Sequence, residues 1–168
     1  MSLSRNDLFA FLEHHGIATT TVEHPPLHTV EESQALRGEI SGGHTKNLFV
    51  KDKKGTLFLI VAEETRPIDL KTLHKTIGAQ GRLSFGSAEQ MGELLGVQPG
   101  SVTALGLVND TEHRVRLVLD AGLLAHDMLN CHPLTNTATT TIARDDLLAF
   151  FAATGHTPLV VSLDETPT

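Results

Sequence analysis

The sequence has little of what secreted, membrane-spanning or nucleic-acid-coating proteins need. Cysteine occurs once, as Cys131, which excludes a disulfide framework and favours a reducing compartment. No apolar run approaches the roughly 20 residues of a membrane-spanning helix, and residues 1–6 contain no hydrophobic signal region. The net charge is −7, whereas proteins that coat nucleic acid non-specifically are usually basic. We therefore expect a cytoplasmic protein with no membrane contact and no binding to DNA.

The charge is unevenly distributed along a chain of 168 residues, which is the length of one domain. Residues 43–82 contain eight Lys or Arg and four Asp or Glu, so this segment carries +4 within an acidic chain. A small basic patch on an acidic body favours local contact with a phosphate-bearing ligand. A charged hairpin exposed to solvent is the alternative interpretation.

Periodicity, capping residues and turn residues predict short strands interleaved with helices. The predicted strands are 18–23, 46–51, 56–62, 82–85, 105–109, 115–120, 137–142 and 158–163. The predicted helices follow Ser4, Thr29, Asp69, Ser87 and Asp145, and they end near Gly16, Leu36, Ile77, Leu95 and Thr154. Because hairpins and helical connections are mixed, we expect one α+β domain built on a mixed sheet. No repeat or linker divides the chain, and we expect residues 164–168 to fray.

Two glycine-containing segments have the composition of anion-binding sites. In residues 42–50 a glycine pair precedes Lys46 and Asn47, which offer a point charge for a phosphate and an amide for orienting a substrate. In residues 96–103, Gly96, Pro99 and Gly100 force a tight turn with exposed backbone N–H groups. The simpler alternatives are a strand that starts with a solvated lysine, and a helix stop followed by a turn. The segment 96–103 is not a Walker loop and lacks the GxGxxG pattern of a dinucleotide fingerprint.

A third segment, residues 131–137, contains candidate groups for proton transfer and hydrogen bonding. His132 titrates near neutral pH, and Asn136 can bind a substrate amine, amide or hydroxyl. The adjacent Cys131 and His132 do not form a zinc signature, since neighbouring residues rarely converge on one ion and no CxxC or HxxxH accompanies them. A nucleophilic role for Cys131 needs an activating base or a lowered pKa, and the sequence indicates neither.

Together the three segments resemble those of a known family. KNLFVKDKKG, GVQPGSVTALGLVND and HPLTNTATTTI stand in this order at appropriate separations. They are similar to the YbaK/prolyl-tRNA-synthetase-associated family of aminoacyl-tRNA deacylases, and within it to the freestanding alanyl-tRNA(Pro) deacylase group (PrdX or ProXp-ala). The resemblance extends roughly from Asp7 to Val161. One departure is that Ala104 follows Thr103, where the family usually has proline.

The resemblance implies a strongly curved, barrel-like sheet surrounded by helices, in one editing domain over residues 1–168. It implies hydrolysis of the ester that joins a wrong amino acid, most often alanine, to tRNA(Pro). The essential lysine of the family corresponds to Lys46, with Asn47 beside it; the glycine loop corresponds to residues 96–101 and the histidine to His132. The implied partners are the acceptor end of mischarged tRNA(Pro) and prolyl-tRNA synthetase, and no cofactor or metal is implied.

The residues favour attack by water, assisted by hydroxyl groups of the substrate, because they contain no credible Ser-His-Asp triad. Backbone N–H groups at Gly100 and Ser101 are the expected oxyanion donors. Lys46 is expected to hold the terminal phosphate or ribose, while Asn47, Gly96, Pro99 and Asn136 shape the substrate site. His132 as the general base is the alternative. Removal of another small residue (cysteine or serine) and a non-catalytic module that binds tRNA or a synthetase are the competing functions.

Overall fold

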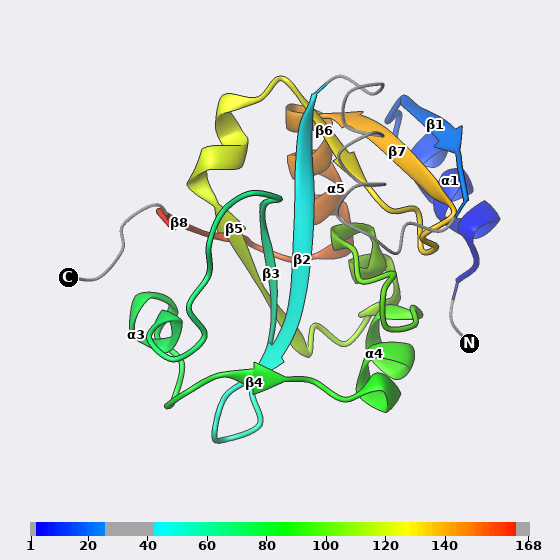
Figure 1. Ribbon diagram of the computed structural model, residues 1–168. Helices are drawn as coiled ribbons and strands as arrows, with labels where there is room; N and C mark the ends of the chain where they lie inside the picture. Colours follow the sequence, from blue (N-terminus) through cyan, green and yellow to red (C-terminus); the bar gives the residue numbers. More distant parts are fainter. Residues whose placement is uncertain (1–2, 26–41, 164–168) are drawn as a thin grey trace.

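The structure, a computed structural model, describes residues 3–25 and 42–163. In this part of the chain eight strands form one mixed, curled sheet in the order β1-β7-β6-β2-β3-β5-β8, and β4 pairs with β2 (Figure 1). The strands are β1 Thr19–Glu23, β2 Gly43–Lys51, β3 Leu57–Glu63, β4 Ser84–Phe85, β5 Val115–Asp120, β6 Met128–Cys131, β7 Ala138–Ala143 and β8 Leu159–Val161. The helices are α1 Arg5–His14, α3 Leu73–Ile77, α4 Ala88–Leu95 and α5 Arg144–Thr154, with 3-10 turns η1 Ala104–Asn109 and η2 Ala121–Ala125. The predicted α+β class with a curved, mixed sheet is confirmed.

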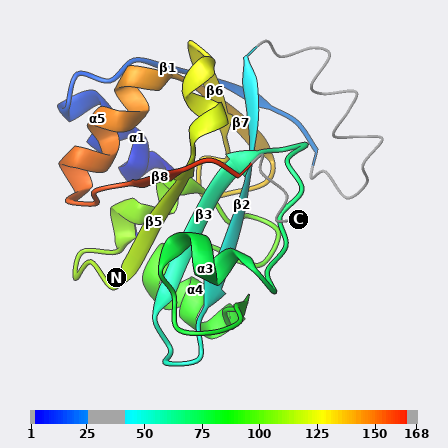
Figure 2. The ribbon, with the colours of Figure 1, turned by 90° about the vertical axis from the view of Figure 1, so that its left-hand side faces the viewer.

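The centre of the sheet is buried on both faces. β3 pairs antiparallel with β2 and parallel with β5, and its residues 57–62 are all buried. The larger core lies between one face of the sheet and α1, α4, α5 and η1, whereas a smaller core lies under α3 on the other face. Figure 2 shows α1 and α5 side by side, and the rings of Phe11 and Phe150 meet edge to face with centroids 5.8 Å apart.

Capping and turn residues place the helix starts and the central hairpin as expected. Ser4 and Ser87 each accept a hydrogen bond from the third residue of their helix, and each helix completes a reciprocal capping box. Residues 52–55 turn between β2 and β3, with Gly55 at φ +85°. The Asp52 carboxylate accepts from the N–H groups of Lys54 and Thr56, both at 2.9 Å. The sequence was sufficient to predict these helix starts and this hairpin, because each involves residues only a few positions apart.

The strand predicted at residues 105–109 is wrong, because this segment forms the 3-10 turn η1. Its residues Ala104–Val108 are all buried, so the apolar run has no face pattern that separates a strand from a buried helical turn. Thr103 caps the turn by accepting from the Leu105 N–H. Gly106 then packs against Leu95, and a Cβ on Gly106 would lie 3.1 Å from the Leu95 carbonyl oxygen.

Other predicted boundaries need smaller corrections. The helix expected after Asp69 begins at Leu73, since residues 69–72 form a turn in which the Leu73 N–H donates to the Asp69 carbonyl. The strand expected at 82–85 is reduced to Ser84–Phe85. β6 and η2 had not been predicted. The helix expected after Thr29 and ending near Leu36 lies outside the described residues.

A buried carboxylate–imidazole pair fastens the start of β5 to the end of α5. Asp110 accepts at 2.9 Å from each of three groups, which are the N–H of Arg114, the N–H of Val115 and Nε2 of His156. Burial raises the pKa of Asp110, but the hydrogen bonds from His156 and the two backbone groups lower it further, so it lies below its ordinary value. Asp110 and His156 are 2% and 5% exposed, so neither can recover solvation if the other is removed.

We predict that His156→Ala lowers the free energy of unfolding by about 1–3 kcal/mol, because it leaves the buried Asp110 carboxylate without its side-chain hydrogen-bond donor. Urea unfolding at pH 7 measures the change. Glu23→Ala is the control, since Glu23 pairs with Arg5 at the surface and its side chain is 66% exposed. An equal loss in both variants would contradict this account of the buried pair.

Candidate functional site

Lys46 and Asn47 lie on opposite faces of the central strand. In the β2–β3 register Lys46 stands opposite Ala62, and Asn47 stands opposite Val61. Because side chains alternate along a strand, Asn47 shares a face with Phe49 and the larger core, whereas Lys46 shares a face with the smaller core. One strand therefore supplies a cation to one side of the sheet and an amide to the other.

The Lys46 ammonium is half-buried and lies in an anionic surrounding. Its Nζ donates to the carbonyl oxygen of Arg66, in the turn that follows β3. Burial lowers the pKa of Lys46 below its ordinary value, and the carboxylates of Glu64 and Asp120 oppose this by favouring the charged form. The Arg66 guanidinium is itself held in ion pairs with Glu63 and Asp120. The surroundings of Lys46 thus suit a lysine that keeps its charge while partly shielded from water.

Asn47 carries an unused acceptor. Its Oδ1 is buried and has no hydrogen-bond partner among the residues that the structure describes. An unpaired buried acceptor typically costs about 1–3 kcal/mol, so such atoms call for an explanation. A donor supplied by a bound molecule, such as an ammonium or hydroxyl group, would satisfy it.

His132 follows β6 and presents a neutral imidazole. β2 and β6 pair in parallel with His44 opposite Asn130, and Lys46 and His132 come two residues further along their segments. Nδ1 lies 3.4 Å from the Ala138 carbonyl oxygen, which only accepts, so we place the ring proton on Nδ1 and a lone pair on Nε2. Burial and the charge of His24 lower the pKa of His132, and together they outweigh the opposing Ala138 bond and Glu64. The ring is therefore neutral at pH 7.

Glu64 connects the lysine and the histidine electrostatically. Its charge raises the pKa of both Lys46 and His132, so all three groups lie in one electrostatic neighbourhood. His24 belongs to the same region, because its Nε2 lies 2.9 Å from Oγ1 of Thr139 and its charge acts on His132. The sequence had singled out Lys46 and His132 but neither Glu64 nor His24.

The glycine loop and the third segment meet in space. The loop begins at Gly96, the left-handed residue that ends α4, and reaches an exposed Pro99 followed by Gly100 at φ +94°. A Cβ on Gly100 would lie 3.8 Å from Nδ2 of Asn136. Asn136 stands in the tight turn between β6 and β7, in which Leu134 adopts φ +66°, a rare conformation for leucine. Two segments about 35 residues apart in the sequence thus meet at Gly100 and Asn136.

The Ser101 N–H, expected from the sequence to be an oxyanion donor, already has a backbone partner. This N–H closes the turn by donating to the Gln98 carbonyl oxygen at 2.9 Å. The Gly100 N–H, by contrast, donates to no group within residues 3–25 and 42–163. Within the described residues, the Gly100 N–H is therefore available to a ligand, whereas the Ser101 N–H closes the turn. The role of Ser101 as an oxyanion donor stays a prediction.

Cys131 is fully buried, and burial raises its pKa to about 12. At neutral pH the residue is a thiol, which is a poor nucleophile. In the described part of the chain, no group of three or more His, Cys, Asp or Glu is placed to hold a metal ion. No helix of that part is long and apolar enough to span a membrane.

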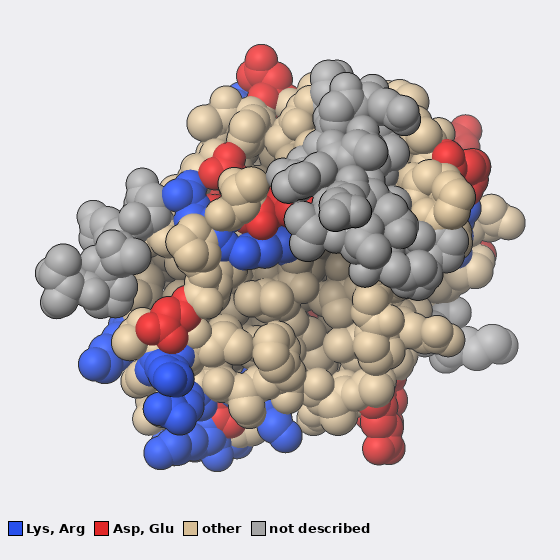
Figure 3. Space-filling view, in the orientation of Figure 1, with Lys and Arg blue, Asp and Glu red and all other residues tan. Residues whose placement is uncertain are grey.

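The eight Lys and Arg side chains of residues 43–82 divide into two groups. Lys46 and Arg66 lie in the network described above. The remaining six cations form what we name the basic surface: Lys51, Lys53, Lys54, Lys71, Lys75 and Arg82. Figure 3 shows Lys and Arg side chains gathered where the β2–β3 hairpin and α3 lie, at one end of the molecule. All of the basic surface except Lys51 is well exposed, so it is available to a large anionic partner.

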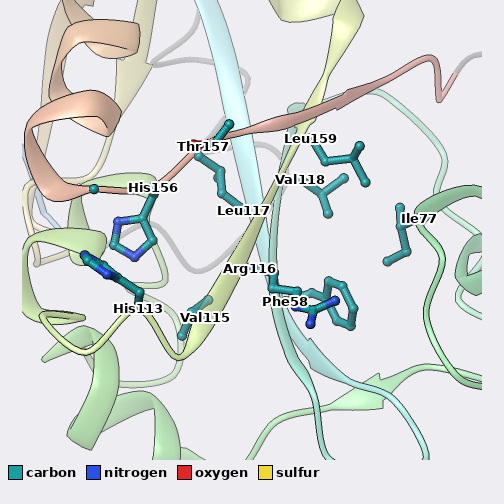
Figure 4. A pocket seen from close by; sticks show the side chains of 11 residues that line it. Phe58, Ile77, His113, Val115, Arg116, Leu117, Val118, His156, Thr157 and Leu159 are labelled. Carbon is teal, nitrogen blue, oxygen red and sulfur yellow. The ribbon is translucent and has the colours of Figure 1, made fainter.

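A separate pocket opens where β8 leaves the edge of β5 (Figure 4). His113 and His156 stand at one end of it, and apolar side chains such as Phe58 and Leu159 stand at the other. None of the residues singled out from the sequence lines this pocket. It is therefore distinct from the region of Lys46, His132 and the glycine loop.

Comparison with known proteins identifies the family. The model of the aminoacyl-tRNA editing domain matches residues 24–150, a range that contains Lys46, Gly100 and His132. The chain belongs to this family. It is an aminoacyl-tRNA deacylase, an enzyme that hydrolyses the ester of mischarged tRNA, and the predicted family membership and enzyme class are confirmed.

Similar proteins cover nearly the whole chain. The sequence is 43% identical over 162 residues to "Prolyl-tRNA synthetase associated domain-containing protein 1" of Danio rerio, covering 95% of this chain and 88% of that protein. It is 34% identical over 161 residues to "Prolyl-tRNA editing protein ProX" of Acetoanaerobium sticklandii, covering 95% and 98%. A crystal structure described as that of a candidate trans-editing enzyme for prolyl-tRNA synthetase superposes with a TM-score of 0.71 at 25% identity, covering 96% of this chain and 99% of that one.

We predict that deacylation is constant around neutral pH and falls as the pH drops through the lowered pKa of His132. Activity falls toward acid pH because the working form of His132 is the neutral ring, and protonation removes its Nε2 lone pair. His132→Gln should lose this acidic limb and reduce turnover by roughly 10- to 100-fold. Single-turnover rates between pH 5 and 8 test this, and an unchanged acidic limb in His132→Gln would assign the titration to another group.

Proposed function

We propose that this deacylase acts in trans on tRNA(Pro) mischarged with alanine. The observation that carries the substrate assignment is similarity over 98% of the length of a protein named for prolyl-tRNA editing. The reason for such an enzyme is physical. Alanine is smaller than proline, and an apolar synthetic pocket rejects a smaller rival by only about 1–3 kcal/mol, so a second site must remove the error.

In the proposed complex, Lys46 and the basic surface bind the tRNA. The half-buried Lys46 ammonium holds the terminal phosphate or ribose as a point charge. The basic surface contacts phosphates of the acceptor end, which accounts for cations clustered on an otherwise acidic protein. Prolyl-tRNA synthetase is the second proposed partner, in keeping with the name of the Danio rerio relative.

The amino acid and its carbonyl are held by groups that have no hydrogen-bond partner among residues 3–25 and 42–163. The buried Oδ1 of Asn47 accepts from the α-ammonium group of the substrate. The Gly100 N–H, which has no partner in the described residues, donates to the ester oxygen as negative charge develops. Asn136, next to Gly100, limits the room for the side chain, so that proline is excluded.

Water is the proposed nucleophile. Its oxygen adds to the ester carbonyl carbon, the bond to the 3′ oxygen breaks, and that oxygen takes the proton released by water. The 2′-hydroxyl of the substrate assists, and the neutral His132 accepts a hydrogen bond through Nε2. The Cys131 thiol, with a pKa of about 12, takes no part.

The oxyanion assignment predicts a contrast between two neighbouring substitutions. Gly100→Val should lower turnover by on the order of 100- to 1000-fold, because a β-branched residue resists φ +94° and displaces the donor. Ser101→Ala should keep most activity, since its backbone turn bond remains. Single-turnover hydrolysis and tRNA binding are measured separately, and the loss in Gly100→Val should fall on hydrolysis. If Ser101→Ala were inactive and Gly100→Val active, the oxyanion donor would be the Ser101 hydroxyl and not the Gly100 N–H.

The substrate proposal is tested by deacylation of tRNA(Pro) carrying alanine, cysteine, serine or proline. We predict that the alanyl ester is cleaved fastest and the prolyl ester is spared. Lys46→Ala should lower cleavage by about 100-fold or more while remaining folded, because it removes a charge that the substrate needs and no core packing. Arg114→Ala, which removes an exposed cation outside the basic surface, is the matched control and should remain active.

The competing functions predict different results in this panel. Preference for the cysteinyl or seryl ester would make the enzyme a deacylase for that residue. Inactivity on all four esters would favour a non-catalytic module that binds tRNA or a synthetase. Wild-type activity in a folded Lys46→Ala would contradict the role given to Lys46.

A further inference from the structure

The turn that receives the Lys46 ammonium is held by one buried carboxylate. Asp120, at the end of β5, is fully buried. Its Oδ2 accepts from the Glu63 N–H at 3.1 Å and from Nε of Arg66 at 3.2 Å. Its Oδ1 accepts from the Gly122 N–H at 3.0 Å. Both ends of the turn at residues 63–66 are thus fastened to the same side chain.

A second contact fixes the orientation of Arg66 and links the turn to the start of β2. Glu63 accepts from Nη2 of Arg66 at 2.9 Å and lies 2.5 Å from Nε2 of His126. The His126 ring packs on Gly43, where a Cβ would lie only 2.6 Å from the ring. The turn therefore has little freedom relative to β2, the strand that carries Lys46.

We propose that Asp120 is the positioning residue for Lys46: it holds the 63–66 turn so that the Arg66 carbonyl oxygen orients the ammonium toward the substrate. The proposal rests on the role that the proposed function gives to Lys46. Asp120 acts through Arg66 and touches no substrate atom. The groups that face the ammonium are the Arg66 carbonyl and the carboxylates of Glu64 and Asp120.

Asp120 also acts on the charge of Lys46. Its negative charge raises the pKa of the ammonium and so opposes the lowering caused by burial. Removing that charge lowers the pKa of Lys46 further, and the pH at which activity declines on the alkaline side moves down. A purely structural carboxylate would not produce this shift, because it has no electrostatic link to the lysine.

The chain offers a matched control. Asp110 is also buried and also accepts from two backbone N–H groups and one side chain, that of His156. Unlike Asp120, it is not among the carboxylates that act on Lys46. Asp120→Asn and Asp110→Asn therefore remove similar interactions from two different places. Each full-length variant is characterised by urea unfolding, by single-turnover deacylation from pH 6 to 10, and by NMR titration of labelled lysine ammonium groups, with Lys46 assigned by the signal missing in Lys46→Ala.

For Asp120→Asn we expect a kcat reduced by about 10- to 100-fold with little change in KM, since misplacement of a catalytic group mainly affects the chemical step. We also expect a lower Lys46 pKa and a matching shift of the alkaline limb. Asp110→Asn should lose stability and change neither the Lys46 titration nor that limb. If Asp120→Asn does not fold, Arg66→Lys is tested instead. A lysine cannot bind both Asp120 and Glu63 as the Arg66 guanidinium does, so this variant should likewise have a lower kcat.

An unchanged Lys46 titration in Asp120→Asn would overturn the positioning role, even if activity fell. A similar shift in Asp110→Asn would overturn it as well, by showing a general effect of lost stability. Failure of the proposed function would give a different result from failure of the positioning role. The wild-type protein would then cleave none of the esters, while the NMR titration would still report whether Asp120 controls Lys46.

Discussion

The site depends on the pairing of β2 along both of its edges. β3 on one side and β6 on the other fix which face each β2 residue occupies. A shift of one residue would exchange Lys46 and Asn47, placing an ammonium in the larger core and an amide beside Asp120. The buried Phe49 and Val50, which belong to different cores, oppose such a shift. The hydrophobic pattern of one strand therefore determines where the charged and polar groups act.

Partial burial gives these groups their chemical character. Removal from water lowers the pKa of both Lys46 and His132. The carboxylates of Glu64 and Asp120 limit how far the pKa of Lys46 falls. The result is a neutral histidine and a shielded cation, with the Glu64 charge acting on both. The same low polarity keeps Cys131 a thiol and removes it as a rival nucleophile. Such a site suits orientation and polarisation of an ester better than covalent catalysis.

Local signals in the sequence were enough for several parts of the fold and the site. The capping boxes at Ser4 and Ser87 and the hairpin at residues 52–55 involve neighbours, so the pattern alone predicts them. The role of Asp120 was missed because it joins β5 to a turn more than 50 residues away. The only hints were a charged residue at the end of a buried strand and a nearby Gly122.

The wrong strand prediction at residues 105–109 has a specific physical cause. The buried run at residues 104–108 has no polar alternation, so tertiary packing against Leu95 decided between a strand and a 3-10 turn. Likewise, a glycine-rich turn does not reveal from its sequence which of its N–H groups closes it, and here the Ser101 N–H does so. Both features depend on contacts that are absent from any short window of sequence.

The central proposal is that groups from both faces of β2, Lys46 on one and Asn47 on the other, act together with Gly100 and His132 on alanyl-adenosine. NMR titration of the full chain with the non-hydrolysable amide analogue of 3′-alanyl-adenosine tests it most directly. We predict chemical shift changes at the Gly100 N–H, the Asn47 side-chain amide and the His132 ring, with much weaker binding of the prolyl analogue. Changes confined to the pocket beside His113 and His156, or equal binding of both analogues, would contradict the account.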